Sequence, residues 1–182
     1  MLWVNWWFEE EGINKMKLLR EAIRRLILEN MGAQFTTMKE HPLWIALSAQ
    51  GSRVQASHHQ GVVFIDHPEG CTSEVYLSLD EEEHPGGIWV DNLYVMNTET
   101  RELDPECFRK GYAKELLALL TQAADQTGTH LTLIAAFEPY LGRKYPSLEL
   151  PDKDQLANLY SQFGFVETER NFAQIYMKRD PK

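Results

Sequence analysis

Apolar residues recur at helical spacing in three segments of the chain. Within 13–30 the repeating apolar positions are Ile13, Met16, Leu19, Ile23, Leu26 and Ile27. In the second segment they are Ala113, Leu116, Leu117, Leu120 and Ala124. The third segment, 152–163, is shorter, and a glycine follows each of the last two segments. These spacings predict three amphipathic helices, with Gly128 and Gly164 as the stops of the last two.

Runs of β-branched, aromatic and alternating apolar residues predict strands between glycines and polar turns. They cover 53–59, 61–67, 73–80, 87–96, 130–137 and 171–179. In 73–80 the alternation places Val75, Leu77 and Leu79 on one face. The run 87–96 is nearly continuously apolar and aromatic, which is typical of a buried strand. Segment 41–51 fits either a strand or a short helix with proline in its first turn.

The order of these elements indicates the fold class. From residue 87 onward the order is strand, helix, strand, helix, strand, which is typical of an α/β unit with right-handed crossovers. The 182 residues are sufficient for one domain with its own core. We therefore expect a single α/β domain over residues 1–182.

Composition and charge indicate which classes of binding partner are favoured and which are disfavoured. The chain holds 27 Asp and Glu against 18 Lys and Arg. A net charge of −9 disfavours broad nucleic-acid binding and is compatible with an amine-bearing substrate, although acidic residues also simply raise solubility. No apolar run approaches the roughly 18 residues of a membrane helix, so we expect no membrane association. The opening MLWVNWWFEE lacks the cationic front of a signal peptide.

The two cysteines point to a reducing compartment. Cys71 and Cys107 are far apart in the sequence and show no metal-like spacing. This arrangement argues against a disulfide scaffold and against a zinc site. We therefore expect free thiols, no metal and a cytoplasmic location.

The stretch CFRKGYAKELL places two cations and a glycine before a helix. Negative charge is favoured at a helix start, so Arg109 and Lys110 suggest that an anion arrives from outside. Gly111 would let the backbone approach that anion closely, and Ala113 is small enough to leave room. The pattern favours an anion cradle, such as one for a pyrophosphate. A glycine that merely precedes a helix is the alternative.

Three segments together resemble the GNAT superfamily of N-acetyltransferases, over residues 87–178. The turn Asp104-Pro105-Glu106 followed by Gly111-Tyr112-Ala113 is similar to the family's acetyl-CoA loop, NLYSQFGF (158–165) to its Leu-Tyr-x-x-x-Gly-Phe segment, and WVDNLYV (89–95) to the strand that feeds the loop. The sequence departs from the family at Phe108, where Arg or Gln is usual, and at Arg109, where Gly is usual. Residues 96–103 and 138–153 form longer connections than usual.

The resemblance implies a GNAT-like fold with a central mixed, mostly antiparallel twisted sheet flanked by helices. It implies acetyl-CoA as the co-substrate, bound by the half 87–178, and an acceptor bound by the half 1–86. The implied cofactor-binding residues are Leu93, Tyr94, Val95, Arg109, Lys110, Gly111, Tyr112 and Ala113. The strand 93–95 corresponds to the one whose amide meets the oxyanion of the reaction.

Two residues are the candidates for proton transfer. Tyr160 matches the tyrosine that protonates the departing thiolate in many members, and a half-buried aromatic anchor is its alternative role. Asp91 interrupts an apolar strand, which favours a general base, although a structural ion pair explains it nearly as well. Glu138, His58 and His59 are weaker candidates for the base. The proton can also leave through water.

The expected function is transfer of an acetyl group from acetyl-CoA to a primary amine of a small molecule or protein. The alternatives are a non-catalytic GNAT-fold binding module and an acyltransferase that uses a different acyl-CoA. The acidic run 80–83 attracts an amine or forms a solvated turn. Trp3, Trp6 and Trp7 pack on the core, cover a sheet edge or form a homodimer contact.

Overall fold

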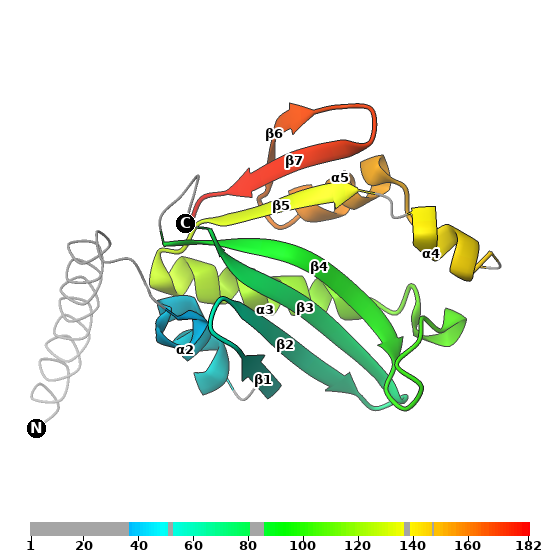
Figure 1. Cartoon of the computed structure of the whole chain (residues 1–182), viewed down its shortest axis with the longest axis horizontal. Coiled ribbons are helices and arrows are strands. Elements are labelled where there is room, and N and C mark those ends of the chain that lie inside the picture. Colours follow the sequence, from blue (N-terminus) through cyan, green and yellow to red (C-terminus); the bar gives the residue numbers. More distant parts are fainter. Residues whose placement is uncertain (1–36, 51–52, 81–85, 137–138, 147) are drawn as a thin grey trace, which may run out of the picture. The chain divides into compact units, whose positions relative to one another are not determined.

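One seven-stranded sheet forms the centre of the part of the chain that the computed structural model describes, residues 37–50, 53–80, 86–136, 139–146 and 148–182 (Figure 1). These residues belong to the compact unit Gln34–Lys182. The predicted helix in 13–30 and the three tryptophans lie outside the described residues, as do 81–83 and Glu138. The prediction of one domain over 1–182 therefore stays a prediction.

The sheet is mixed and mostly antiparallel, with the strand order β1-β2-β3-β4-β5-β7-β6. The strands are β1 (Arg53–Ala56), β2 (Gln60–His67), β3 (Cys71–Asp80), β4 (Gly87–Asn97), β5 (Leu131–Ala136), β6 (Val166–Arg170) and β7 (Gln174–Arg179). The one parallel pair is β4 with β5, joined by a helical crossover. The predicted α/β class with a mostly antiparallel sheet and flanking helices is confirmed.

The helices are α2 (Pro42–Ala49), α3 (Tyr112–Thr127), α4 (Pro139–Lys144) and α5 (Lys153–Ser161), with short 3-10 turns η1 (Met38–Glu40) and η2 (Pro105–Cys107). In Figure 1, α3 and α5 lie behind the strands, and α2 packs against α3. Of the two alternatives for segment 41–51, a strand or a short helix, the structure shows the helix α2, and Pro42 is its first residue. Gly128 ends α3 in a left-handed conformation, as predicted.

The core lies between the sheet and these helices. The apolar face of α3 buries Leu116, Leu117 and Leu120 completely, and they join Val75 and Leu77 of β3 in one cluster. On β2, a side chain at Gly61 would meet the Trp44 ring of α2 at 2.3 Å. Odd-numbered positions of β2 therefore face the helices, and Val62 faces the opposite side of the sheet.

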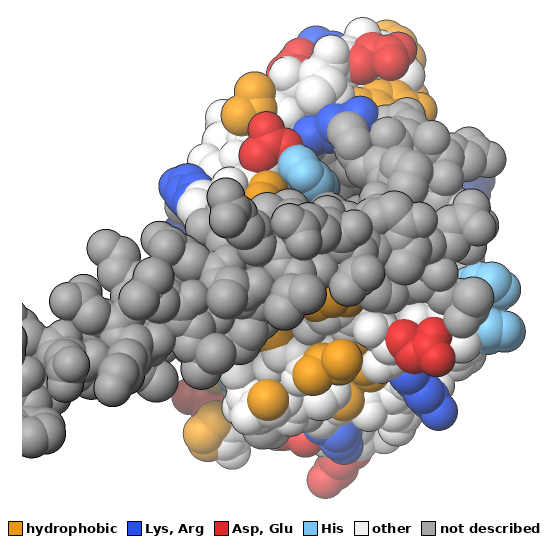
Figure 2. All heavy atoms as spheres, turned by 90° about the vertical axis from the view of Figure 1, so that its left-hand side faces the viewer, with side chains coloured by type: hydrophobic (Ala, Val, Ile, Leu, Met, Phe, Trp, Pro, Cys, Tyr) orange, Lys and Arg blue, Asp and Glu red, His pale blue; other side chains and the backbone are white. Residues whose placement is uncertain are grey.

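Arg179 of β7 ties the ends of two helices together. Its guanidinium donates to the Asp125 carboxylate of α3 at 2.7 and 2.9 Å, and its Nε donates to the Phe163 carbonyl after α5 at 2.7 Å. Arg179 is almost fully buried, so both helix ends are held against β7. On the face shown in Figure 2, the described acidic, basic and hydrophobic side chains are interspersed.

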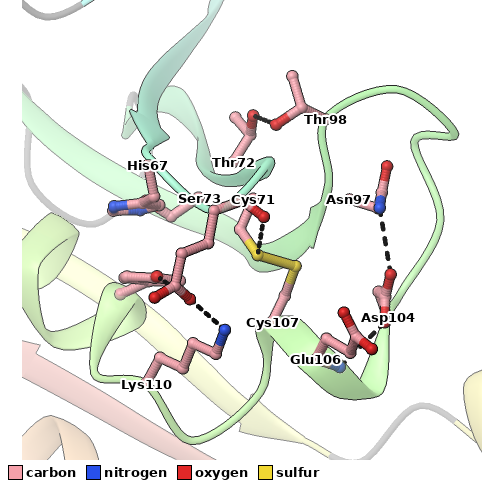
Figure 3. Close-up of a disulfide and its surroundings, with 12 residues drawn as sticks. His67, Cys71, Thr72, Ser73, Asn97, Thr98, Asp104, Glu106, Cys107 and Lys110 are labelled. Carbon is pink, nitrogen blue, oxygen red and sulfur yellow. Dashed lines mark hydrogen bonds and ion pairs between the residues drawn. A yellow bond between two sulfur atoms is a disulfide. The ribbon is translucent and has the colours of Figure 1, made fainter.

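The cysteine prediction is wrong, because Cys71 and Cys107 form a disulfide with Cα atoms 5.7 Å apart (Figure 3). Cys71 opens β3 and pairs in register with Asn97, so the 36-residue separation closes through strand pairing and a return loop. The carboxylate of Asp104 holds that loop by accepting from the Asn97 side chain at 3.1 Å and from the Glu106 amide at 2.9 Å. The cysteine spacing therefore no longer supports a reducing compartment.

Candidate functional site

The site begins where β4 separates from β5. Their parallel register runs from Ile88↔Leu131 to Val90↔Leu133 and stops there, although both strands continue. At the same point β4 carries a bulge against β3, which leaves Asp91 outside the register. A bulge bends and twists its strand. Among the described residues, the edge of β4 after Val90 consequently has no strand partner on the β5 side.

A cleft of about 680 Å³ occupies this opening, a volume suited to a ligand of cofactor size. It is lined by residues 91–95 of β4, 107–114 around the start of α3, Ile134 and Ala136 of β5, Leu141 of α4, and Leu156, Leu159 and Tyr160 of α5, with Leu103, 149–151 and Gln155. All ten residues that the sequence predicted for the site border this one cleft. Their roles stay predictions.

The apolar wall of the cleft was not predicted. Leu156 and Leu159 lie on α5 and are partly buried against the core, and Leu150 and Pro151 precede that helix. From the sequence alone, Leu156 and Leu159 cannot be told from ordinary core positions of an amphipathic helix. Their proximity to the other lining residues depends on the separation of β4 and β5.

The start of α3 has the backbone geometry of an anion site. Gly111 caps the helix with φ of +90°, and Arg109 also adopts a left-handed φ, of +62°. The first amides of a helix have no intrahelical acceptor, and the dipole of the 16-residue α3 adds positive potential there. No side chain caps this helix start. The arrangement can therefore accept a phosphate group at the cleft.

The two cations before α3 have carboxylate partners within the chain. Arg109 pairs with Glu149, and Lys110 pairs with Glu69, as Figure 3 shows for Lys110. The Tyr112 hydroxyl also donates to Glu69 at 3.1 Å. The hydrogen bond from Lys110 and then that from Tyr112 lower the pKa of Glu69. These internal carboxylate partners were not predicted, and exposed pairs of this kind are weak enough to exchange. The prediction that an anion arrives from outside the chain therefore stays a prediction.

The disulfide and a stack of two rings hold the segment from Cys107 to Tyr112, which leads into α3. Cys107 is 2% exposed, borders the cleft and fixes η2 to the start of β3. The buried His67 ring stacks on the ring of Tyr112 with centroids 3.7 Å apart, and it hydrogen-bonds Ser73 at 3.0 Å. The segment from Cys107 to Tyr112 is thus anchored at both ends.

Tyr160 borders the cleft from α5 and is 8% exposed. Its ring packs edge-on against Phe165 with centroids 6.0 Å apart. Within the part of the chain that the structure describes, its hydroxyl has no hydrogen-bond partner. Burial raises the pKa of Tyr160 to about 12, so the phenol stays protonated at neutral pH. It is therefore a proton donor rather than a base.

Asp91 lies at the bulge, where it borders both the cleft and a second cavity of about 460 Å³. The Ser78 hydroxyl donates to its carboxylate at 3.0 Å. Partial burial raises the pKa of Asp91, and the Ser78 hydrogen bond offsets part of that rise. Of the other candidate bases, His58 and His59 do not line the cleft and stack on each other in the exposed β1–β2 turn, while Glu138 lies outside the described residues.

Other predicted features lie elsewhere. Asp80 is buried at the end of β3, so it does not act as an exposed amine-attracting charge. The described residues include no group of three or more His, Cys, Asp or Glu that could hold a metal ion. Nor does this part of the chain contain a helix long and apolar enough to cross a membrane.

No family model matches the chain, and no curated protein matches it. Among solved structures, the crystal structure of PH1933 from Pyrococcus horikoshii OT3 matches with a TM-score of 0.39 and 13% identity. The match covers 63% of this chain and 66% of that chain, so the chain spans just under two thirds of its length.

Proposed function

We propose that this protein is a GNAT-like N-acetyltransferase that moves an acetyl group from acetyl-CoA to a primary amine. One observation carries the proposal: the gap between β4 and β5 leads directly to the helix start at Gly111, and Tyr160 borders the same cleft. A helix start suited to a phosphate, an open strand edge and a buried phenol could together bind a CoA thioester and assist its cleavage.

The residues present fit acetyl-CoA. The amides at the start of α3 would take the pyrophosphate, helped by Arg109 and Lys110 once they exchange Glu149 and Glu69 for phosphate oxygens. The left-handed φ of Arg109 falls at the position where the resembled family usually has glycine, so the loop keeps a glycine-like backbone there. The open edge of β4 at 93–95 would hold the extended arm of the co-substrate.

In the proposed reaction the amine nitrogen attacks the thioester carbon, a C–N bond forms and the C–S bond breaks. A lysine-like ammonium has a pKa near 10.4, so it must lose one proton before attack, which Asp91 would accept directly or through water. The nitrogen loses its second proton to solvent as the amide forms. Backbone amides of β4 would stabilise the oxyanion. Tyr160 would give its proton to the leaving thiolate and regain one from solvent.

Tyr160→Phe is expected to lower kcat by about 10²- to 10⁴-fold, the usual contribution of a positioned acid. The hydroxyl has no described hydrogen-bond partner, so the variant should keep its melting temperature and its affinity for acetyl-CoA. The measurement is steady-state kinetics with calorimetry. Tyr176→Phe on β7, whose hydroxyl donates to Gln174 and does not line the cleft, is the matched control. Equal losses of turnover and affinity would make Tyr160 a structural tyrosine.

The pH profile tests Asp91. Its raised pKa means that, as pH falls, its proton-accepting form is lost at a higher pH than for an ordinary aspartate. We expect kcat/KM to fall with decreasing pH through that pKa, which forms the acidic limb of the pH profile. Asp91→Asn should remove this acidic limb and lower the rate. Ser78→Ala removes a hydrogen bond that lowers the pKa, so it should move the limb to higher pH. If neither variant changes the acidic limb, the general base is a group other than Asp91.

The proposal itself is tested by following free thiol released from acetyl-CoA in the presence of a panel of primary amines. Amine-dependent release that Tyr160→Phe suppresses is the expected result. The internal ion pairs of Arg109 and Lys110 favour one alternative, a non-catalytic member in which these cations serve the fold. Acetyl-CoA binding without amine-dependent thiol release would support that alternative.

A further inference from the structure

A second cavity, of about 460 Å³, lies beside the cleft and is formed by strands β1 to β4. Its lining is Gln55, Ala56, Ser57, Gln60, Val62, Tyr76, Leu77, Asp91 and Asn92. Val62 pairs in register with Gln55 and with Tyr76, and Tyr76 pairs with Asn92. Because Val62 faces away from α2, this row lies on the side of the sheet opposite to α2 and α3.

The two cavities meet at the bulge of β4. Asp91 and Asn92 border both of them. Since Val90 pairs with Leu77 and Asn92 pairs with Tyr76, Asp91 is the extra residue, and a bulge re-aims its side chain. A molecule in the second cavity would therefore meet the cleft at the residue proposed to take up a proton.

The lining of the second cavity combines neutral hydrogen-bonding side chains with a carboxylate. Gln55, Gln60 and Asn92 carry amides, and Ser57 carries a hydroxyl, so this part can both donate and accept hydrogen bonds. Asp91 is the one charged residue among the described residues of the lining. The Tyr76 hydroxyl donates a hydrogen bond to the carboxylate of the fully buried Glu74 at 3.1 Å, and Glu74 forms an ion pair with Arg101. An anionic ligand would gain no cation here and would meet the Asp91 carboxylate.

We propose that this cavity binds the acetyl acceptor, and that the acceptor is a small primary amine with a neutral, hydroxyl- or amide-bearing body. This inference rests on the proposed function. The amine would lie at the Asp91 end, and the neutral body would bond the amides and hydroxyl at the Gln55–Gln60 end. Amines with an anionic body would bind poorly, and a polyamine would gain little, since Asp91 is the one carboxylate in the described lining.

The probes are glucosamine and glycinamide as neutral-bodied amines, with glutamate and spermidine as comparisons. Each is titrated into the full-length protein saturated with CoA, up to roughly tens of millimolar, above the millimolar Kd of a weak ligand. The readout is the NMR shift of the side-chain amides of Gln55, Gln60 and Asn92. We expect saturable shifts with glucosamine or glycinamide. Glutamate should bind at least about fivefold more weakly, which corresponds to a binding free energy less favourable by about 1 kcal/mol.

Val62→Trp should fill the cavity and weaken binding of the responding amine by about tenfold or more, the scale of a lost 1.4 kcal/mol. Its control is Val166→Trp on the exposed strand β6. Gln60→Leu, at an exposed position, is the second variant should Val62→Trp fail to fold. We expect both cavity variants to bind acetyl-CoA as the unaltered protein does, within about twofold.

The outcomes separate the two proposals. If the cavity amides respond to none of the probes, or respond equally in Val62→Trp or Gln60→Leu, the acceptor site is wrong. That holds even when acetyl-CoA binds and an amine is acetylated, since the proposed function then stands alone. If acetyl-CoA itself does not bind, the proposed function fails, and an amine response of this cavity would no longer mark an acceptor site.

Discussion

Gly111→Val is expected to weaken acetyl-CoA binding by about 10- to 100-fold, because a β-branched residue held in the left-handed region costs about 1–3 kcal/mol. Gly111 has a φ of +90° at the start of α3. Valine would either strain the loop or turn the first helical amides away from the phosphate position. No atom lies within 4 Å of an added Cβ, so the loss would come from backbone conformation rather than from a clash within the fold.

Gly128→Val is the matched control for this experiment. Gly128 lies at the other end of the same helix, has a φ of +69°, and also has no atom within 4 Å of an added Cβ. Both variants should lose similar stability in thermal denaturation, while only Gly111→Val should lose affinity in calorimetry. Equal affinities in the two variants would show that the start of α3 does not bind the co-substrate.

Removal of the Cys71–Cys107 disulfide is expected to cost about 3–4 kcal/mol of stability, the loop-closure value for a loop of this length. The bond closes a separation of 36 residues and both cysteines are buried. We expect Cys71→Ser with Cys107→Ser, or reductant on the unaltered protein, to lower Tm by roughly 5–15 °C. Because Cys107 borders the cleft shortly before Gly111, acetyl-CoA affinity should fall as well.

The double serine variant supplies the control for reductant. Its Tm should be the same with and without dithiothreitol, and close to that of the reduced unaltered protein. Thermal denaturation and a thiol count on the unfolded chain are the measurements. Two free thiols in the non-reduced protein, or a Tm that reductant leaves unchanged, would contradict this account.

Local patterns predicted most of the sheet and its main helix. The apolar positions Val75 and Leu77 of β3 and most of 87–90 of β4 are buried, and burial leaves a direct signal in the sequence. Residues 91–95 of β4 belong to the same apolar run but are half-buried or exposed and border the cleft, so the prediction of a buried strand is wrong for them. β6 was missed because all five of its residues are exposed, so it has no apolar face. α4 was missed because a six-residue helix is too short to show a period.

Contacts between distant segments could not be predicted. The disulfide depends on the register of Cys71 with Asn97, which no local pattern encodes. Similarly, Glu69 and Glu149 reach Lys110 and Arg109 from segments 41 and 40 residues away. The ten candidate site residues were found because motif order placed them on β4, the start of α3 and α5, and the fold brings those elements together around one cleft.

Calorimetric titration of the 182-residue protein with acetyl-CoA, against a buffer control, shows directly whether the cleft binds the co-substrate. We expect one site per chain with a Kd in the micromolar range, with affinity weakened in Gly111→Val and unchanged in Gly128→Val. Absence of a binding heat up to roughly millimolar acetyl-CoA, with the same result by a second equilibrium method, would contradict this expectation.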